Sequence, residues 1–157
     1  GDGLRRNEIG YLPQQTIVQR DFPASVQEIV LSGCQSRCGL RPFYSREEKQ
    51  LAQDAMHKMQ IGSLAKCCYR ELSSGQQQRV SIGRALINAP SVVLADEPTG
   101  NLDRKNSQEI VELLKYSNRQ YGQTLIVITH DESIALQADR VLAIEDGHIV
   151  RDEVIRK

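Results

Sequence analysis

Two short runs of consecutive apolar, β-prone residues constrain the fold of this chain more than any other feature. They occupy residues 92–95 (VVLA) and 125–128 (LIVI), and the segment between them carries the helix-spaced Ile110, Val111 and Leu114 before Gly122. Fully apolar runs of this length are typical of strands buried in a parallel sheet. A strand, a helix and a strand in this order form a parallel unit, so the sequence predicts an α/β fold with two buried strands.

The first half of the chain reads as one short strand followed by helices. Residues 9–12 are the expected strand, which ends at Pro13. The pairs Ser25–Glu28 and Ser45–Glu48 have the capping-box spacing, and they predict helices that end near residues 33 and 62. A third helix is expected over residues 76–88, and a hairpin with a type I′ turn at residues 146–147. We therefore expect an all-helical subdomain at residues 22–89, inserted ahead of the sheet residues at 90–157.

The charge balance limits the partners of the chain. Its 20 Lys and Arg residues match its 20 Asp and Glu residues, so the formal net charge is zero. Nucleic-acid binding draws on a basic excess, and this balance argues against a nucleic-acid partner. The apolar runs are also far shorter than the ~18 residues that a membrane span requires, so we expect no segment to cross a bilayer.

Four cysteines, Cys34, Cys38, Cys67 and Cys68, allow two interpretations. Four thiolates are a common ligand set for zinc, but the adjacent Cys67 and Cys68 project in different directions and suit one tetrahedral ion poorly. No secretion signal is recognisable in the sequence. Reduced thiols in a cytosolic protein are therefore the simpler interpretation.

Polar residues follow each of the three predicted parallel strands. Gln14 comes two residues after the first strand, Asp96 and Glu97 follow the second, and His130 follows the third. Ligands of such sheets bind beyond the carboxyl ends of the strands, where these side chains should converge. Taken singly, the two acids also fit a solvated turn, and His130 also fits a helix cap together with Asp131.

Residues 72–79 (LSSGQQQR) stand at the start of a predicted helix. The free backbone N–H groups and the positive dipole end of a helix N-terminus attract anions such as a γ-phosphate. Gly75 permits close backbone approach, while Ser73 and Gln76 offer side-chain hydrogen bonds. The alternative is a serine N-cap followed by an exposed, glutamine-rich helix face.

The order of these segments resembles that of the ATP-binding cassette (ABC) ATPases. Residues 10–14 (GYLPQ) resemble the Q-loop, 72–76 (LSSGQ) the signature motif and 92–97 (VVLADE) the Walker B motif. Residues 101–103 (NLD) resemble the D-loop and 129–131 (THD) the H-loop. The five motifs span nearly the whole chain. The resemblance implies a P-loop NTPase-type, mostly parallel sheet core with an inserted all-helical subdomain.

The resemblance also implies catalytic roles at the strand ends, with ATP and Mg²⁺ as cofactors. Gln14 would contact Mg²⁺ and the attacking water, and it would couple the site to a transmembrane partner. Asp96 would organise Mg²⁺, while Glu97 would act as general base. His130 would touch the γ-phosphate of ATP.

A second set of roles concerns a head-to-tail dimer. The resemblance implies that Ser73, Gly75 and Gln76 bind the nucleotide held by the opposite subunit, and that Asp103 lies at the dimer interface. Ser74 departs from the family pattern, which usually has glycine there. A hydroxymethyl group is tolerable at that position only if its Cβ points away from the phosphate.

One family motif is absent from the sequence. A P-loop requires the pattern G-x-x-x-x-G-K-[ST], and none of the 11 glycines is followed by lysine. The family carries this motif ahead of the Q-loop, and the sequence opens on Gly1 without an initiator methionine. We therefore expect the chain to be the later part of the ABC domain, and to be inactive by itself.

The function implied by the resemblance is that of the ATP-hydrolysing subunit of an ABC transporter. Its partners would be transmembrane permease subunits and a second ATP-binding subunit, on the cytoplasmic face of the cell membrane. Residues 22–33 and 41–44 resemble uptake systems for metal ions or chelates, whereas residues 96–103 resemble exporters and lipoprotein-release systems, so the cargo stays open. One alternative is an ABC-type ATPase head that acts on DNA, but the sequence has neither coiled-coil heptads nor an excess of basic residues. A second alternative is a fragment that binds a partner without nucleotide.

Overall fold

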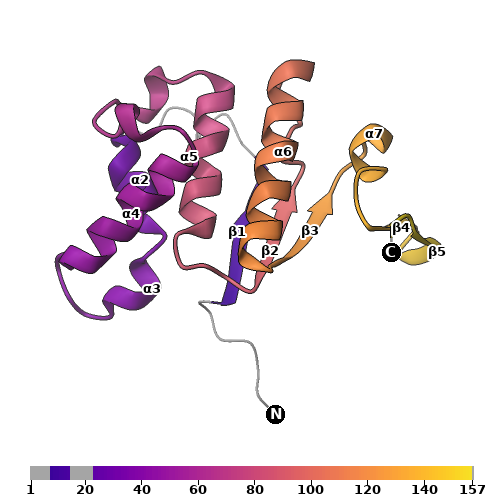
Figure 1. Ribbon diagram of the computed structural model, residues 1–157, viewed down its shortest axis with the longest axis horizontal. Coiled ribbons are helices and arrows are strands. Elements are labelled where there is room, and N and C mark those ends of the chain that lie inside the picture. The colour runs from indigo at the N-terminus through magenta and orange to yellow at the C-terminus, as the bar shows by residue number, and fades with distance from the viewer. Residues whose placement is uncertain (1–7, 15–22, 157) are drawn as a thin grey trace, which may run out of the picture.

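The computed structural model describes residues 8–14 and 23–156. Its centre is a parallel sheet in the order β1-β2-β3, formed by β1 (Ile9–Leu12), β2 (Val92–Asp96) and β3 (Thr124–Ile128) (Figure 1). Helix α6 (Arg104–Tyr121) connects β2 to β3, and it ends at Gly122, whose φ of 59° is left-handed. The predicted strand-helix-strand unit and its parallel pairing are thus confirmed.

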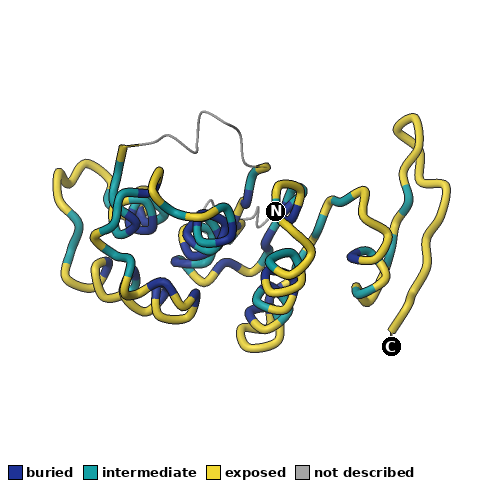
Figure 2. The backbone as a smooth tube through the Cα atoms, turned by 90° about the horizontal axis from the view of Figure 1, so that it is seen from above, coloured by how far each residue is buried: buried dark blue, intermediate teal, exposed yellow. Residues whose placement is uncertain are grey.

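The expectation that both strands of this unit are fully buried is wrong for β3. The sheet has one covered face, on which Leu12, Val93 and Ala95 are buried. On the other face Ile126 and Ile128 are 47% and 50% exposed. Helices α5 and α6 lie along the covered face, so apolar side chains that point the other way along β3 remain half exposed (Figure 2).

The helical part consists mainly of α2 (Val26–Ser32), α4 (Arg46–Lys58) and α5 (Ser74–Leu86). Both predicted Ser–Glu capping boxes are present at the starts of α2 and α4. Helix α5 begins two residues earlier and ends two residues earlier than the predicted span of 76–88. The structure adds a short helix, α3 (Gln35–Cys38), and the 3-10 turns η2 (Gly62–Leu64) and η3 (Tyr69–Glu71).

These helices share a core whose buried members include residues from all three. Val30, Met56 and Val80 are each at most 2% exposed. The core continues to Leu12 and Ala95 of the sheet and to Ile110 and Leu114 of α6, so the two parts pack as one body. Burial of a side chain of this size contributes roughly 1.5–3 kcal/mol, and the helical part is therefore held by packing rather than by helix propensity.

Two glycines let α5 approach the rest of the fold closely. A Cβ on Gly33, which caps α2, would lie 2.4 Å from the carbonyl oxygen of Arg84. A Cβ on Gly10 of β1 would lie 2.6 Å from the carbonyl oxygen of Ala85. The carboxyl end of α5 thus rests on both β1 and α2 without space for a methyl group.

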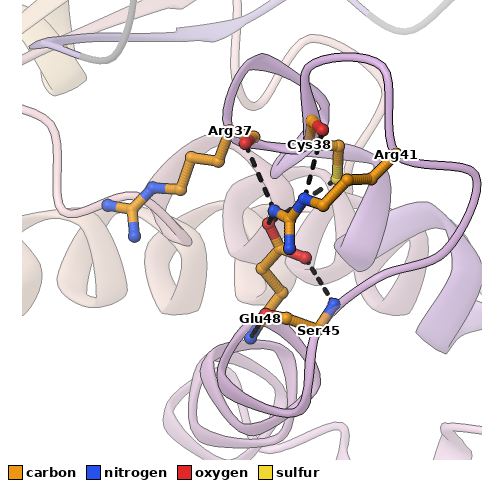
Figure 3. A network of polar contacts seen from close by, with 5 residues as sticks. All are labelled: Arg37, Cys38, Arg41, Ser45 and Glu48. Atoms are coloured by element: carbon orange, nitrogen blue, oxygen red, sulfur yellow. Dashed lines mark hydrogen bonds and ion pairs between the residues drawn. The ribbon is translucent and has the colours of Figure 1, made fainter.

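A buried carboxylate fixes the loop between α3 and α4 (Figure 3). Glu48 accepts hydrogen bonds from the backbone N–H of Ser45 at 2.7 Å, from Nη2 of Arg41 at 3.0 Å and from the thiol of Cys38 at 3.6 Å. The Ser45 hydrogen bond is the main cause that holds the pKa of Glu48 below its usual range. The same loop exposes the side chains of Leu40 and Phe43 to solvent.

The chain ends in α7 (Glu132–Ala135) and an antiparallel hairpin of β4 (Arg140–Glu145) and β5 (His148–Val154). Asp146 and Gly147 have φ angles of 47° and 78°, which confirms the expected type I′ turn. No helix in the described part of the chain is long and apolar enough to span a bilayer.

Candidate functional site

The three parallel strands end at one edge of the sheet. Leu12, the last residue of β1, pairs with Ala95, and Asp96 pairs with Ile128 at the end of β3. Gln14, Glu97 and His130 follow these pairs within two residues. The structure therefore brings the four strand-end candidates to a common edge, as expected from the sequence.

Glu97 and His130 are in direct contact at this edge. Oε1 of Glu97 accepts a hydrogen bond from the backbone N–H of His130 at 3.0 Å and lies 2.8 Å from its Nδ1. The hydroxyl of Thr129 lies 3.5 Å from Oε2. Three groups from the end of β3 thus hold the carboxylate that follows β2.

The backbone of Glu97 is unusual. Its φ is 44°, in the left-handed region that non-glycine residues rarely adopt, and its N–H donates to the carbonyl of Ile128 at 2.9 Å. Such conformations persist where surrounding contacts enforce them, and they concentrate at functional sites. The turn after β2 therefore aims the carboxylate of Glu97 at the end of β3.

The imidazole of His130 is 85% exposed apart from its contact with Glu97. The hydrogen bond to Glu97, followed by the charge of that carboxylate, raises the pKa of His130 above 6.5. The cap of α7 is made by Asp131, which accepts from the backbone N–H of Ser133 at 2.9 Å. His130 itself is thus not the helix cap, and its Nε2 side remains open to a ligand.

Asp96 and Gln14 are the candidates for Mg²⁺. The side chain of Asp96 is half-buried, and within the described residues no hydrogen-bond donor engages its carboxylate. Gln14 is exposed and lies two residues after β1, the strand that pairs with β2. Carboxylate and amide oxygens are the hard ligands that Mg²⁺ prefers, so the donor set fits this ion.

The signature-like residues lie at the N-terminus of α5. Oγ of Ser73 accepts from the backbone N–H of Gln76 at 3.2 Å, and Oε1 of Gln76 accepts from the backbone N–H of Ser73 at 2.9 Å. The two side chains therefore form a capping box with each other, which is the alternative that the sequence left open. Ser73 is nevertheless exposed, and its hydroxyl can still donate to an anion.

Asp103 caps α6 and is joined to Asn106, a residue that the sequence reasoning missed. The carboxylate accepts from the backbone N–H of Asn106 at 2.8 Å and from its side-chain amide at 2.9 Å. These hydrogen bonds are the main cause that holds the pKa of Asp103 below its usual range. An asparagine three residues after an N-cap aspartate is the signal that could have identified Asn106.

The candidate residues thus form two groups. Gln14, Asp96, Glu97 and His130 share the sheet edge, whereas Ser73, Gly75, Gln76 and Asp103 stand at the N-termini of α5 and α6. Among the described residues no hydrogen bond connects the two groups. The four cysteines lie outside both, and none forms a disulfide.

Comparisons with known proteins show the family of the chain. The family model described as "ABC transporter" matches residues 2–100. A macrolide export ATP-binding/permease protein MacB of Bartonella quintana is 36% identical over 156 residues, which cover 98% of this chain and 22% of that protein. Its counterpart from Chlorobaculum tepidum is 39% identical over 96% of this chain and 22% of that protein. The chain thus spans about a fifth of the length of these relatives.

Solved structures give the same answer for the fold. A dimeric ATP-binding cassette in a post-hydrolysis state with ADP and Pi has a TM-score of 0.77 and is 34% identical, covering 98% of this chain and 65% of that one. A metal-chelate-type ABC transporter in an inward-facing conformation has a TM-score of 0.85 at 27% identity, covering 94% of this chain and 59% of that one. The fold is therefore the expected P-loop NTPase-type α/β fold, and the chain belongs to the ABC transporter family.

Proposed function

We propose that this chain supplies the catalytic carboxylate and the signature helix of an ATP-hydrolysing ABC transporter subunit. The observation that carries the proposal is the contact between Glu97 and His130 at 2.8 Å, at the sheet edge that also holds Asp96. In the intact protein, this chain is joined to a phosphate-binding loop. ATP hydrolysis would then drive transport across a membrane.

The strand-end residues divide the work of hydrolysis. When bound, Mg²⁺ supplies charge neutralisation at the phosphates, and Asp96 and Gln14 are the residues that would hold it. Glu97 orients a water molecule and accepts its proton as general base. His130 keeps Glu97 in place through Nδ1 and reaches toward the γ-phosphate through the opposite side of its ring.

The signature group serves the nucleotide of a second subunit. Ser73 is exposed at the N-terminus of α5, where backbone N–H groups and the helix dipole favour an anion. No hydrogen bond joins it to the Glu97 group within the described chain, so the two groups fit the two different sites of a head-to-tail dimer. The dimeric form of the related cassette with ADP and Pi supports this arrangement.

Mixing two inactive variants of the intact protein tests the head-to-tail arrangement. One variant is Glu97→Gln, which lacks the general base, and the other is Ser73→Arg, which blocks the signature helix. In a mixed dimer, one site combines both defects and the other site combines an intact Glu97 with an intact Ser73. Half of randomly formed dimers are mixed and half of their sites are intact, so phosphate release should recover to about a quarter of the wild-type rate.

The matched control places both substitutions in the same copy and mixes that copy with wild type. Every mixed dimer then has one defect in each site, so the mixed species should be inactive. Wild-type dimers make up a quarter of this control mixture, so the comparison is made on purified mixed dimers. Active mixed dimers in the control, or inactive mixed dimers in the first mixture, would contradict a site that is shared between subunits. Tags of different kinds on the two copies allow the mixed dimers to be purified before the assay.

The helical part is the surface that we propose contacts the membrane subunit, on the cytoplasmic face of the cell membrane. Leu40 and Phe43 project from its α3–α4 loop, and Phe43 is 81% exposed. Apolar side chains of this exposure support an interaction surface. The similar proteins include macrolide exporters and a metal-chelate-type transporter, so the proposal does not extend to the cargo.

A further inference from the structure

Helices α5 and α6 lie side by side and touch at two successive levels (Figure 1). At the first level, Gly75 of α5 is buried, and a Cβ placed on it would lie 2.8 Å from Oδ1 of Asn106 on α6. One turn further along, Nη2 of Arg79 lies 3.1 Å from Oε2 of Glu109, and the side chain of Arg79 is 16% exposed. The N-termini of the two helices are therefore held together by short-range contacts.

The orientation of Asn106 follows from its partner. A carboxylate is only an acceptor, so the amide nitrogen of Asn106 must face Asp103, where it lies 2.9 Å from Oδ2. The amide oxygen is thereby turned toward Gly75. One side chain thus contacts the cap of α6 with its nitrogen and the first turn of α5 with its oxygen.

We propose that Asn106 is a positioning residue, which keeps the signature residues of α5 and Asp103 in one fixed geometry. The proposal rests on the proposed function, in which both elements face the nucleotide of the opposite subunit. Asn106 touches no nucleotide in this scheme. It acts through Gly75 and Asp103, so that the two elements enter or leave the dimer interface as one unit.

The chemistry of the contact makes both residues specific. An aspartate at position 106 would place a second carboxylate against Asp103, and an alanine would leave a gap beside Gly75. An alanine at position 75 would overlap the amide of Asn106, because 2.8 Å is shorter than any normal Cβ contact. With alanine at position 106, the nearest remaining atom is Cβ at 3.6 Å, which is an ordinary contact distance.

A double-mutant cycle in the intact protein tests this coupling. The variants are Gly75→Ala, Asn106→Ala and the double variant, each in a Glu97→Gln reference in which the ATP-bound dimer should accumulate. We expect Gly75→Ala to weaken ATP-dependent dimerisation by about tenfold or more. In the Asn106→Ala background, the loss of dimerisation caused by Gly75→Ala should be smaller by a factor of about five or more, because the overlap has been removed.

The control is Gln108→Ala, an exposed position on the same helix, which should neither weaken the dimer nor suppress Gly75→Ala. ATP affinity of the separated subunit should stay within about twofold in all variants, since a positioning residue does not hold the subunit's own nucleotide. Equal costs of Gly75→Ala with and without Asn106 would overturn the proposal.

Thermal unfolding of the same variants keeps this result distinct from a failure of the proposed function. A Glu97→Gln reference that does not dimerise with ATP would overturn the proposed function, and with it the role of Asn106 in the dimer. The midpoints of thermal unfolding would still report the contact itself. They should show the same suppression of Gly75→Ala by Asn106→Ala, and additive shifts would contradict it.

Discussion

Replacing Glu97 by glutamine in the intact protein is the most direct test of the site. The substitution preserves the shape of the side chain, and an amide oxygen can still accept the backbone N–H of His130 that lies 3.0 Å from Oε1. It removes the negative charge and with it the ability to accept a proton from water. General-base catalysis commonly contributes 10²–10⁴ in rate, which is about 2.7–5.4 kcal/mol in activation free energy. Turnover should therefore fall by at least ~100-fold.

Two measurements separate this effect from misfolding. Phosphate release at saturating Mg-ATP reports the loss of turnover, and light scattering after size-exclusion chromatography reports the nucleotide-bound dimer. The dimer should accumulate in Glu97→Gln, because ATP is bound but not consumed. The matched control is Glu132→Gln, which changes an exposed carboxylate on α7 and should hydrolyse ATP at the wild-type rate.

Turnover of Glu97→Gln within about threefold of the wild-type rate would exclude Glu97 as the general base. The water would then be activated by another group, and the contact between Glu97 and His130 would be a structural feature of the strand ends. Loss of turnover without any ATP-dependent dimer would instead indicate that the substitution disturbs nucleotide binding.

Four further predictions concern single groups. Histidine NMR should show the pKa of His130 raised above its usual range, and Glu97→Gln should bring it back toward that range. The stabilising contact between the two side chains is therefore present at low pH and is lost as the pH rises through the raised pKa. Gly33→Ala should lower stability by about 1–3 kcal/mol in thermal unfolding, while Gly62→Ala, which has open space, should change it by less than about 0.5 kcal/mol. All four cysteines should react with a thiol reagent after denaturation, and the purified protein should lack zinc. In the native state the buried Cys34 should react last, because burial raises its pKa. Calorimetry on this chain alone should give a Kd for Mg-ATP above about 1 mM, because each missing phosphate contact of a P-loop removes roughly 1.5–3 kcal/mol of binding free energy. A Kd below about 10 μM would contradict this prediction.

Local sequence signals predicted most elements of the fold because each signal has a short-range cause. Capping boxes at Ser25 and Ser45 satisfy backbone N–H groups within three residues, and Gly122 supplies the left-handed residue that ends α6. The burial of β3 could not be predicted in this way. Whether Ile126 and Ile128 are covered depends on which face of the sheet the helices occupy, and that is decided by packing far along the chain.

The strand-end group was predictable for a similar reason. Parallel strands place their carboxyl ends at one edge, so residues that follow three such strands converge without further information. The contact between Asp103, Asn106 and Gly75 was not predictable, since it depends on the spacing between two helices that are separated by a strand. The sequence predicts Gly75 as a point of close backbone approach to phosphate, and it carries no sign that a Cβ at this position would also face Asn106 of the same chain.

The two groups differ in how the fold holds them, and this difference bears on how the subunit works. Glu97 is held in a left-handed backbone conformation, at a cost of about 1–3 kcal/mol, by contacts to Ile128 and His130 that all lie within one sheet edge. The signature residues instead stand on α5, whose carboxyl end rests on β1 and whose amino end touches α6 through Asn106. Because the helical part and the sheet share one core, the signature residues and Glu97 keep their relative positions within one subunit. Under the proposed function, hydrolysis at one site therefore depends on how the whole second subunit approaches, while Glu97 keeps its position within its own subunit.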